Sequence, residues 1–226
     1  MKRLNFRQIA WRVGQDIADG MIVNLGLGLP VLVSDYIPAD RDVFIQSENG
    51  IIGVGPLASP GDADPDLVDA GSRRVSLRPG AAIVDSAASF AMIRGGHLDV
   101  TVLGAFEVTA NGDLANWDMG DPSRPPLVGG AMDLAASSKA TWAMMEYSTK
   151  TGAHRLVELC SLPLTAPHCV THVYTDLAVI EVNDGFTVLE MVDGVTRDEL
   201  QRLSGAPLAF APGGRSLITP DLPDGR

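Results

Sequence analysis

The sequence has little of what several protein classes require. Only two of its 226 residues are cysteines, Cys160 and Cys169, so a disulfide framework is not expected and a reducing compartment is the default. Basic residues are also scarce: 17 Lys and Arg stand against 28 Asp and Glu, and the net charge is −11. Because nucleic-acid binding needs a basic face, a nucleic-acid partner is not expected.

Long hydrophobic segments are missing as well. Met1-Lys2-Arg3 is basic, but no uninterrupted apolar segment follows it, so no targeting signal is predicted. The longest apolar run, residues 21–33, is too short to span a bilayer and contains Asn24 and Pro30. By elimination, the sequence predicts a cytoplasmic protein that does not contact membranes.

The common cofactor and hydrolase signatures are incomplete. There is no Gly-x-Ser-x-Gly elbow and no Walker loop. Gly26-Leu27-Gly28 follows an apolar segment, but Val31 occupies the third glycine position of a dinucleotide fingerprint. His168, Cys169 and His172, with Cys160 upstream, match no standard zinc spacing, and packing roles are favoured for the cysteines. We therefore expect neither a metal nor a resident cofactor.

What is present indicates one globular core. Apolar residues make up 46% of the chain and charged residues 20%, which is typical of a folded globular protein. Expected strands alternate with expected helices, and no repeat or linker interrupts them. The chain is therefore predicted to be a single α/β domain over residues 1–226, with a largely parallel central sheet flanked by helices. Its core would cover about 5–210, and 211–226 would form a loosely held tail.

Several local signals define the expected elements. Asn5 with Gln8, and Thr196 with Glu199, are capping boxes that predict helix starts. Asp85 or Ser86 can cap a further helix, and the glycine-rich stretch 127–134 leads into another. Strands are expected at 21–25, 43–45, 81–84, 100–103, 142–145 and 186–191, with one or two more in 170–182.

Two intervening stretches are predicted to be irregular. Residues 51–56 are apolar, but their glycines and Pro56 indicate flexibility. The Pro/Gly-rich stretch 56–71 carries four acids and is predicted to be an exposed loop with a solvated run of charge: Asp62, Asp64, Asp66 and Asp69.

One short stretch, Gln46-Ser47-Glu48-Asn49-Gly50, stands between an expected strand and a glycine-rich segment. A carboxylate placed there by a strand could meet a substrate. The alternative is a surface glutamate in an ordinary β-turn, because Ser, Asn and Gly are common turn residues, and the pattern alone favours this alternative. The glycines of 26–28 indicate a backbone that comes close to a ligand or to this turn.

Several motifs together resemble one enzyme family. The stretches that carry the resemblance are Gly26–Pro30, Ser47–Gly50, Ser89–Asp99, Gly112–Trp117, Gly129–Leu134 and Leu162–Thr165. They resemble the B (beta) subunits of family I 3-oxoacid CoA-transferases over about residues 6–205. The agreement of several unlinked motifs overturns the turn-only interpretation of Glu48.

The resemblance implies a mechanism and a set of site residues. Glu48 would attack an acyl-CoA thioester and become a glutamyl-CoA thioester in a ping-pong reaction. The loop containing Gly129 and Gly130 would supply an oxyanion donor. Asn49 would orient the Glu48 turn, and the pocket would be lined by a further set of residues: Gly26, Leu27, Gly28, Ser47 and Gly50.

The resemblance also implies partners and substrates. A separate A subunit would supply much of the CoA-binding surface, in a hetero-oligomer that is expected to contain two of each chain. Succinyl-CoA is the expected donor. Residues 141–145 and 173–178 look more like members that use 3-oxoadipate, while Glu146 and residues 162–165 also occur in members that use acetoacetate. A dicarboxylic acceptor would need an additional cation, for which Arg94 is a candidate.

Two other classes stay open at this stage. Sugar-phosphate isomerases and ligand-sensing domains share related α/β folds, and fold does not determine function. A catalytically silent partner of an enzyme is the second alternative. The intact Ser-Glu-Asn-Gly turn counts against both.

Overall fold

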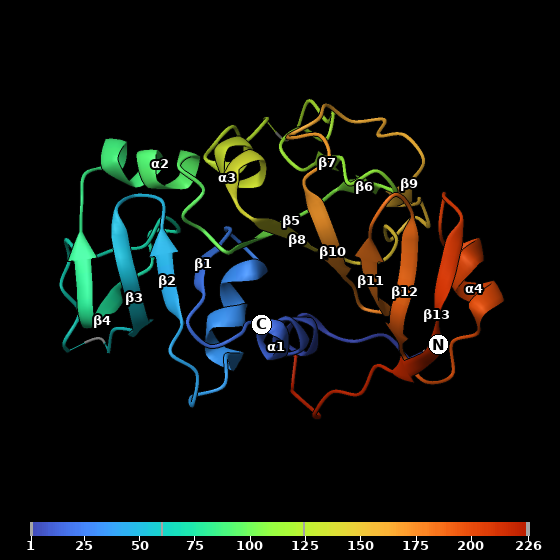
Figure 1. Ribbon diagram of the computed structural model, residues 1–226, viewed down its shortest axis with the longest axis horizontal. Coiled ribbons are helices and arrows are strands. Elements are labelled where there is room, and N and C mark those ends of the chain that lie inside the picture. The colour runs from blue at the N-terminus through green and yellow to red at the C-terminus, as the bar shows by residue number, and fades with distance from the viewer. Residues whose placement is uncertain (1, 60, 124, 225–226) are drawn as a thin grey trace.

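A large mixed sheet runs through the whole molecule in the computed structural model, which describes residues 2–59, 61–123 and 125–224 (Figure 1). Ten strands follow the order β13-β12-β11-β10-β8-β5-β1-β2-β3-β4. Their bounds are β1 (Ile22–Leu25), β2 (Phe44–Ser47), β3 (Ile51–Leu57), β4 (Val75–Ile83), β5 (Val100–Gly104), β8 (Ala140–Met144), β10 (Val170–Tyr174), β11 (Ala178–Val182), β12 (Phe186–Met191) and β13 (Leu208–Ser216). A second sheet, ordered β7-β6-β9, contains β6 (Glu107–Thr109), β7 (Leu114–Ala115) and β9 (Leu156–Val157).

The centre of the large sheet is parallel and its flanks are mostly antiparallel. Strands β2, β1, β5, β8 and β10 pair in parallel, whereas β2-β3-β4 and β10-β11-β12 are antiparallel. Because β2 is added on one side of β1 and β5 on its other side, the order in which strands are added to the sheet reverses at β1. The carboxyl ends of the parallel strands meet at one edge, which is where ligands bind in open α/β sheets.

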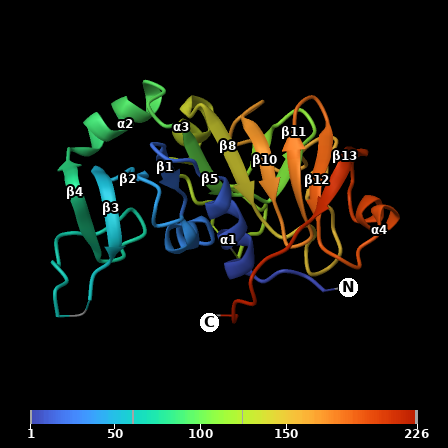
Figure 2. The same ribbon diagram turned by 60° about the horizontal axis from the view of Figure 1, so that its bottom comes forward.

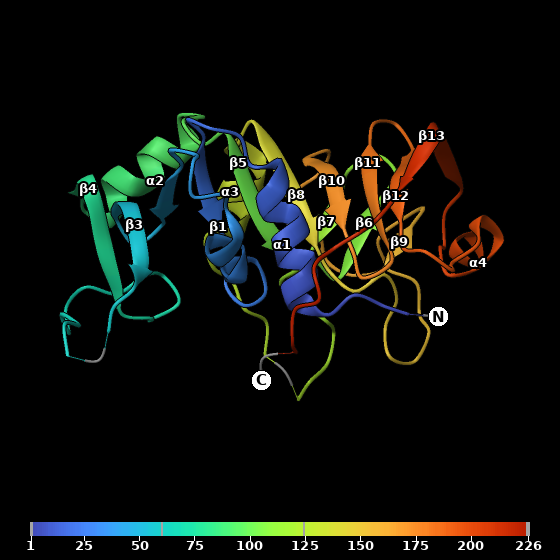
Figure 3. The ribbon, with the colours of Figure 1, turned by 90° about the horizontal axis from the view of Figure 1, so that it is seen from below.

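Helices cover both faces of this sheet. Figures 2 and 3 show α1 (Phe6–Asp16) on one face, and α2 (Ser86–Arg94), α3 (Ala131–Ser137) and the small sheet on the other. The 3₁₀ helix η1 (Pro30–Tyr36) packs beside α1, and α4 (Arg197–Arg202) precedes the last strand. Most of the core lies between these layers and includes fully buried Ile9, Val102 and Leu134. Among the described residues, no helix combines the length and the apolar character needed to cross a membrane.

The structure confirms the elements that local signals predict. Asn5 Oδ1 accepts the Gln8 amide at 2.9 Å, and Gln8 Oε1 accepts the Asn5 amide at 3.0 Å, which is the reciprocal bonding of a capping box at the start of α1. Asp85 caps α2, and Thr196 with Glu199 opens α4. Residues 170–182 form two antiparallel strands rather than one.

The prediction of a flexible segment at 51–56 is wrong, because these residues form most of β3. Pro56 is tolerated there because the pairing with β2 is confined to Ile51 and Ile52, and the register with β4 shifts between Val54 and Leu57. The register with β4 also shifts between Ile52 and Val54, and Gly53, with φ +88°, lies at this shift. The breaker residues therefore mark bulges within a strand.

The expected loose segment after Phe210 also differs from the structure over the residues that are described. Strand β13 continues through Ser216, and Leu217 is buried. Beyond it, the carbonyls of Pro220 and Leu222 accept hydrogen bonds from the Gln8 and Asn5 side chains. The side chains of Gln8 in α1 and of Asn5, its N-cap, hold the segment, and the composition of the tail does not reveal these contacts. The last two residues, 225–226, lie outside the described part of the chain.

Candidate active site

Glu48 lies at the tip of the hairpin that joins β2 to β3. The turn is closed by a 2.9 Å hydrogen bond from the Gly50 amide to the Ser47 carbonyl. Gly50 has φ +127°, and a Cβ at this position would overlap the Val84 carbonyl oxygen. The Val84 amide in turn donates to the Gly50 carbonyl at 2.9 Å. Only glycine meets both demands, so Gly50 sets the direction in which Glu48 leaves the sheet.

Both neighbours of Glu48 are attached to the loop of residues 68–73. Ser47 Oγ accepts the Ala70 amide at 2.8 Å, and Asn49 Nδ2 donates to the Val68 carbonyl at 2.8 Å. The two bonds hold the hairpin tip on either side of the carboxylate. The orienting role of Asn49 stays a prediction, and this contact is the means by which it could act.

Asp69 organises that loop from within. It is only 7% exposed, its Oδ1 accepts the amides of Gly71 and Arg73 at 2.9 Å, and its Oδ2 pairs with Arg73 Nε at 2.8 Å. A buried carboxylate with this many donors is a structural anchor. The expectation that all four acids of this stretch form a solvated run is therefore wrong for Asp69, while Asp62, Asp64 and Asp66 are exposed.

A network of buried polar side chains links β1, β2 and α2 next to the hairpin. Asn24 on β1 donates to Gln46 Oε1 at 2.7 Å, and Gln46 on β2 donates to Ser89 Oγ on α2 at 2.8 Å. The Asn24 Oδ1 atom is buried without a hydrogen-bond partner among the described residues. A polar residue within an apolar strand is the signal that could have identified Asn24 from the sequence.

The Glu48 carboxylate meets the second glycine loop. It accepts a hydrogen bond from the backbone N–H of Gly130, the residue that precedes α3. Burial raises the pKa of Glu48 above its ordinary value, and the Gly130 bond opposes this increase without cancelling it. A Cβ on Gly130 would lie 3.0–3.1 Å from the three carboxyl atoms of Glu48, so a larger residue would push the carboxyl group away by a few tenths of an ångström. Gly129, by contrast, has open space around its Cα.

Two cavities meet at Glu48. The strand cavity, of about 490 Å³, lies against β2, β3 and η1 and is lined by Asn24, Leu27, Val31, Ile45, Gln46, Ser47, Glu48, Val54 and Arg73, among others. The glycine-loop cavity, of about 470 Å³, lies at the carboxyl ends of β1, β5 and β8. It is lined by Gly26, Leu27, Glu48, Leu103, Phe106, Asn116, Gly129, Gly130, Met144, Met145, Glu146 and Arg155, among others. The carboxylate can therefore contact groups held on either side.

The structure brings most of the predicted site residues together. Gly26, Leu27, Gly129 and Gly130 line the glycine-loop cavity beside Glu48, and Leu27 and Ser47 line the strand cavity. Three others line neither cavity: Gly28, Asn49 and Gly50. Asn49 and Gly50 hold the hairpin instead, so the expectation that Gly28 and Gly50 line the pocket is not met.

The first glycine loop is close to a strand. The Gly26 amide donates to the Val102 carbonyl at 2.8 Å, and a Cβ on Gly26 would lie 3.0 Å from the Leu103 side chain. The close approach predicted for this loop is therefore an approach to β5, which brings the ends of β1 and β5 together at the mouth of the cavity.

Two motifs that are distant in the sequence also meet at this cavity. The Asn116 amide donates to Thr165 Oγ1 at 3.0 Å, and that hydroxyl donates to Asn116 Oδ1 at 2.6 Å. Trp117 donates to the Leu164 carbonyl at 3.1 Å. Since Asn116 Nδ2 also holds the Gly104 carbonyl, the pair fixes the wall that follows β5.

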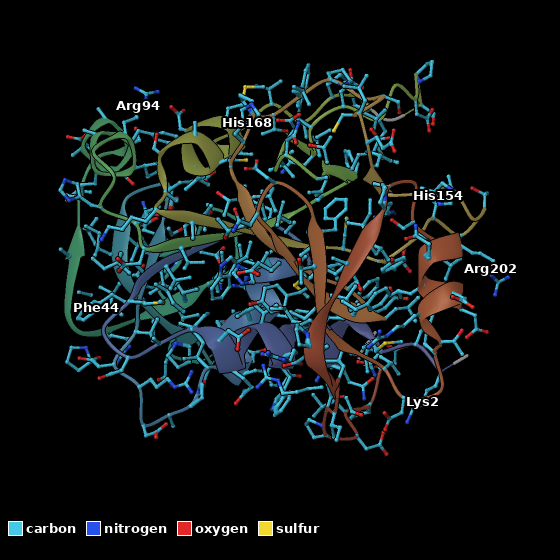
Figure 4. All side chains as sticks on the ribbon, turned by 45° about the vertical axis from the view of Figure 1, so that its right-hand side comes forward. Lys2, Phe44, Arg94, His154, His168 and Arg202 are labelled. Carbon is cyan, nitrogen blue, oxygen red and sulfur yellow. The ribbon has the colours of Figure 1, made fainter. Side chains whose placement is uncertain are left out.

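Arg94, the candidate cation for a dicarboxylic acceptor, lies away from both cavities. Arg94 is 63% exposed, pairs with Asp133 at 2.7 Å, and lines neither cavity (Figure 4 places it at the periphery of the molecule). Arg155, which sequence reasoning missed, lines the glycine-loop cavity together with Glu146. Glu146 follows the parallel strand β8 closely, and its position after that strand is the signal that points to this wall.

The histidines and cysteines do not form a metal centre. Among residues 2–59, 61–123 and 125–224, no group of three or more His, Cys, Asp or Glu side chains is arranged to hold a metal ion. His168 contacts the Asn111 carbonyl at 3.1 Å, and Cys169 contacts the Ala166 carbonyl.

Comparison with known proteins places this arrangement among enzymes. Residues 6–202 match the family described as coenzyme A transferase. The chain is 50% identical to the B subunit of 3-oxoadipate CoA-transferase from Pseudomonas putida over 208 residues, which cover 92% of this chain and 97% of that one. It is 45% identical over 212 residues to the B subunit of a probable succinyl-CoA:3-ketoacid coenzyme A transferase from Bacillus subtilis. These residues cover 93% of this chain and 97% of that one.

A solved structure shares the fold at low sequence identity. An acyl-CoA transferase apoenzyme from Escherichia coli superposes with a TM-score of 0.73 at 20% identity over 94% of this chain. This chain spans only 43% of that protein's length. The likeness supports the predicted α/β fold.

Proposed function

The chain belongs to the coenzyme A transferase family, and from this premise we propose that it is the B subunit of an enzyme that moves CoA from succinyl-CoA to 3-oxoadipate through Glu48. The relative that is 50% identical is named a 3-oxoadipate CoA-transferase, which supports the acceptor. The observation that carries the proposal is the Glu48 carboxylate, which accepts the Gly130 N–H where two cavities meet.

Glu48 is suited to a double displacement. Its carboxylate oxygen attacks the thioester carbonyl of succinyl-CoA, the C–S bond breaks, and an anhydride and CoA thiolate form. The thiolate attacks the Glu48 carboxyl carbon, which releases succinate and leaves a glutamyl-CoA thioester. The carboxylate of 3-oxoadipate then repeats these steps in reverse. An acyl derivative of a carboxylate stays activated, so the energy of the thioester is retained.

The Gly130 N–H is placed to assist the steps at Glu48. Each attack on the Glu48 carboxyl carbon develops negative charge on its oxygen, and the donor that already contacts this carboxyl would stabilise that charge. Because the donor belongs to the backbone before α3, it needs little reorganisation during the reaction. The Gly129 amide is the neighbouring candidate for a second donor.

The two cavities could hold different parts of the acyl-CoA substrate. The strand cavity would take the pantetheine arm, since Glu48 lines it together with the apolar side chains of Val31, Ile45 and Val54. Its three arginines are already engaged: Arg41 with the Gln15 carbonyl, Arg73 with Asp69, and Arg78 with Asp42. The phosphates of CoA would therefore depend on another chain. The glycine-loop cavity would hold the acyl group.

That other chain would be the A subunit, in a hetero-tetramer of two A and two B chains. The segment before Gly129 supports such a contact, because Leu127 is 82% and Val128 69% exposed at the rim of the glycine-loop cavity. Isolated apolar residues on a surface are common, but two large ones beside a reacting group suit a covered position. We also propose that the complex is cytoplasmic and works without a resident cofactor.

Trapping of the enzyme-bound intermediate tests the proposal. The B chain, purified with its A partner, is incubated with succinyl-CoA, digested and examined by mass spectrometry. A CoA-derived adduct is expected on the peptide that contains Glu48, and Glu48→Gln should abolish both the adduct and turnover while the complex stays assembled. An active Glu48→Gln complex, or an intact wild-type complex with no adduct, would overturn the assignment.

Acetoacetate is the second candidate acceptor. The Bacillus subtilis relative is named for 3-ketoacids in general, and it covers the chain equally well. Discharge of the adduct by acetoacetate but not by 3-oxoadipate would keep the mechanism and replace the acceptor.

A further inference from the structure

The wall of the glycine-loop cavity that contains Arg155 is charged in an otherwise apolar space. Leu103, Phe106, Met144 and Met145 make up much of the lining. Among the described residues that line this cavity, Arg155 is the only cation, and Glu48 and Glu146 are the only anions. Because this single cation shares the cavity with Glu48, it can favour acyl groups that carry a negative charge.

The guanidinium of Arg155 is held in place but has few hydrogen-bond acceptors. Its side chain is 18% exposed, Nη1 donates to the Ala105 carbonyl at 3.3 Å, and Nη2 lies 3.9 Å from Glu146 Oε2. Its Nε is buried without a hydrogen-bond partner among the described residues. A guanidinium can donate five hydrogen bonds, so a largely buried one with only two long contacts lacks acceptors.

The backbone keeps this guanidinium at the cavity. Arg155 immediately precedes β9, and its carbonyl accepts the Val108 amide of β6 at 2.9 Å. Since the small sheet fixes its Cα and the Ala105 carbonyl contacts its head, the side chain has little freedom to leave. A preformed cation of this kind loses little entropy when it binds an anion.

We propose that Arg155 binds the distal carboxylate of dicarboxylic acyl groups and so makes the enzyme prefer dicarboxylic over monocarboxylic substrates. The inference rests on the proposed function, in which the other end of the same acyl group reacts at Glu48. Succinate and 3-oxoadipate both have a second carboxylate, whereas acetoacetate has none and would leave Arg155 unmatched. A carboxylate supplies the two parallel acceptors that the guanidinium lacks.

Glu146 moderates this interaction. It is the acid nearest to the guanidinium, and at 3.9 Å it offsets the charge of Arg155 without making a close pair. A bound carboxylate would therefore meet both the attraction of Arg155 and the repulsion of Glu146. Removal of either charge should change dicarboxylate binding, in opposite directions.

Discharge of a preloaded enzyme tests the proposal without the use of a dicarboxylic donor. The complex is loaded to completion with acetoacetyl-CoA, freed of excess donor, and mixed with 3-oxoadipate, succinate or acetoacetate. Loss of the glutamyl-CoA adduct is followed in a single turnover. Arg155→Gln should slow discharge by both dicarboxylates about 10- to 100-fold, the value of one or two charge-assisted hydrogen bonds, and change discharge by acetoacetate less than about threefold.

Three further variants complete the design. Arg94→Gln removes an arginine from outside both cavities and is expected to change none of the three rates. Arg155→Lys should lose less than Arg155→Gln, because the charge stays and the paired geometry is lost. Glu146→Gln should lower the concentration of 3-oxoadipate needed for half-maximal discharge.

The outcomes separate this inference from the proposed function. Equal slowing of all three acceptors in Arg155→Gln, or no slowing of any, in a complex that still loads CoA would overturn the role of Arg155 alone. A wild-type complex that never forms the adduct would overturn the proposed function and this inference with it. Because the loading step itself reports an intact site, a misfolded variant is recognised before discharge is measured.

Discussion

At the scale of single residues, the environment of Glu48 combines two opposing influences on its charge. Burial disfavours the carboxylate, while the Gly130 N–H favours it, and burial is the larger effect, so the pKa is raised. A partly dehydrated carboxylate is a better nucleophile than a fully hydrated one, provided that it remains ionised at the working pH.

The raised pKa of Glu48 predicts the acid limb of the pH profile. Only the ionised form attacks, so the single-turnover rate of adduct formation should fall as pH decreases through the pKa of Glu48. Because that pKa lies above the ordinary glutamate value, the fall should begin at a higher pH than for an exposed glutamate. A rate that stays constant down to the ordinary glutamate pKa would contradict the prediction.

The two adjacent glycines of the second loop predict unequal losses. A Cβ on Gly130 would press on the Glu48 carboxyl group, whereas Gly129 has open space around it. Gly130→Ala should therefore displace the carboxylate and reduce turnover by up to about a hundredfold, which is what a misplacement of about 1 Å can cost. Gly129→Ala should lose far less, and equal losses would show that the contact with Glu48 is not what matters. Thermal unfolding of both variants checks that neither loss is one of folding.

At the scale of elements, the hairpin that presents Glu48 depends on a loop that belongs to none of the named helices and strands. Ser47 and Asn49 bond the backbone of 68–70, and Asp69 holds that backbone in shape. The stability of the loop is thereby linked to the geometry of the site.

Asp69→Ala tests this link. The substitution leaves the Gly71 and Arg73 amides and the Arg73 guanidinium without their acceptor, which should cost about 1–3 kcal/mol in the free energy of unfolding. It should also lower turnover, because the hairpin tip loses its support. Asp62→Ala removes an exposed acid of the same stretch and serves as the control. Denaturant unfolding and steady-state rates of both variants provide the measurements, and equal behaviour would refute the anchor role.

Sequence reasoning predicted elements where the signal is local. The capping boxes of α1 and α4 involve side chains three residues apart, and the structure confirms both. The error at β3 arose because Gly53 and Pro56 are breakers by local rules, although their strand is held by β2 and β4. Asp69 was missed for the same reason. The four acids of 56–71 stand among the same kinds of turn residues, so local rules predict the same exposure for all of them, and only the folded loop buries Asp69.

At the scale of the whole molecule, the order of the parallel strands brings the residues of the site together. Glu48 follows β2, Gly26 follows β1, and Leu103–Phe106 and Glu146 lie at or beyond the ends of β5 and β8, which are parallel neighbours. Glu48 and the glycine loops could be predicted from the sequence because they form motifs. Arg155 could not, since no motif contains it and only the small sheet brings it to the cavity.

The exposed rim of this cavity leads to a prediction about assembly. Val128 is 69% exposed, lies beside the second glycine loop and lines neither cavity, so Val128→Asp should weaken the contact with the A subunit and leave the reacting groups in place. The concentration of the A subunit that restores half of the activity should rise about tenfold, which corresponds to the loss of one well-packed apolar contact. The maximal rate with the A subunit in excess should change little, because no reacting group is altered.

Ile218→Asp is the matched control for this titration. Ile218 is 71% exposed and belongs to the segment after β13, which passes α1 on the face of the sheet opposite α3 (Figure 3). It should leave the requirement for the A subunit unchanged. A B chain that is fully active without its A partner would refute the assembly outright. An equal response of the two variants would instead show that the A partner does not contact the rim at Val128, and the apolar residues beside Gly129 would then need a different explanation.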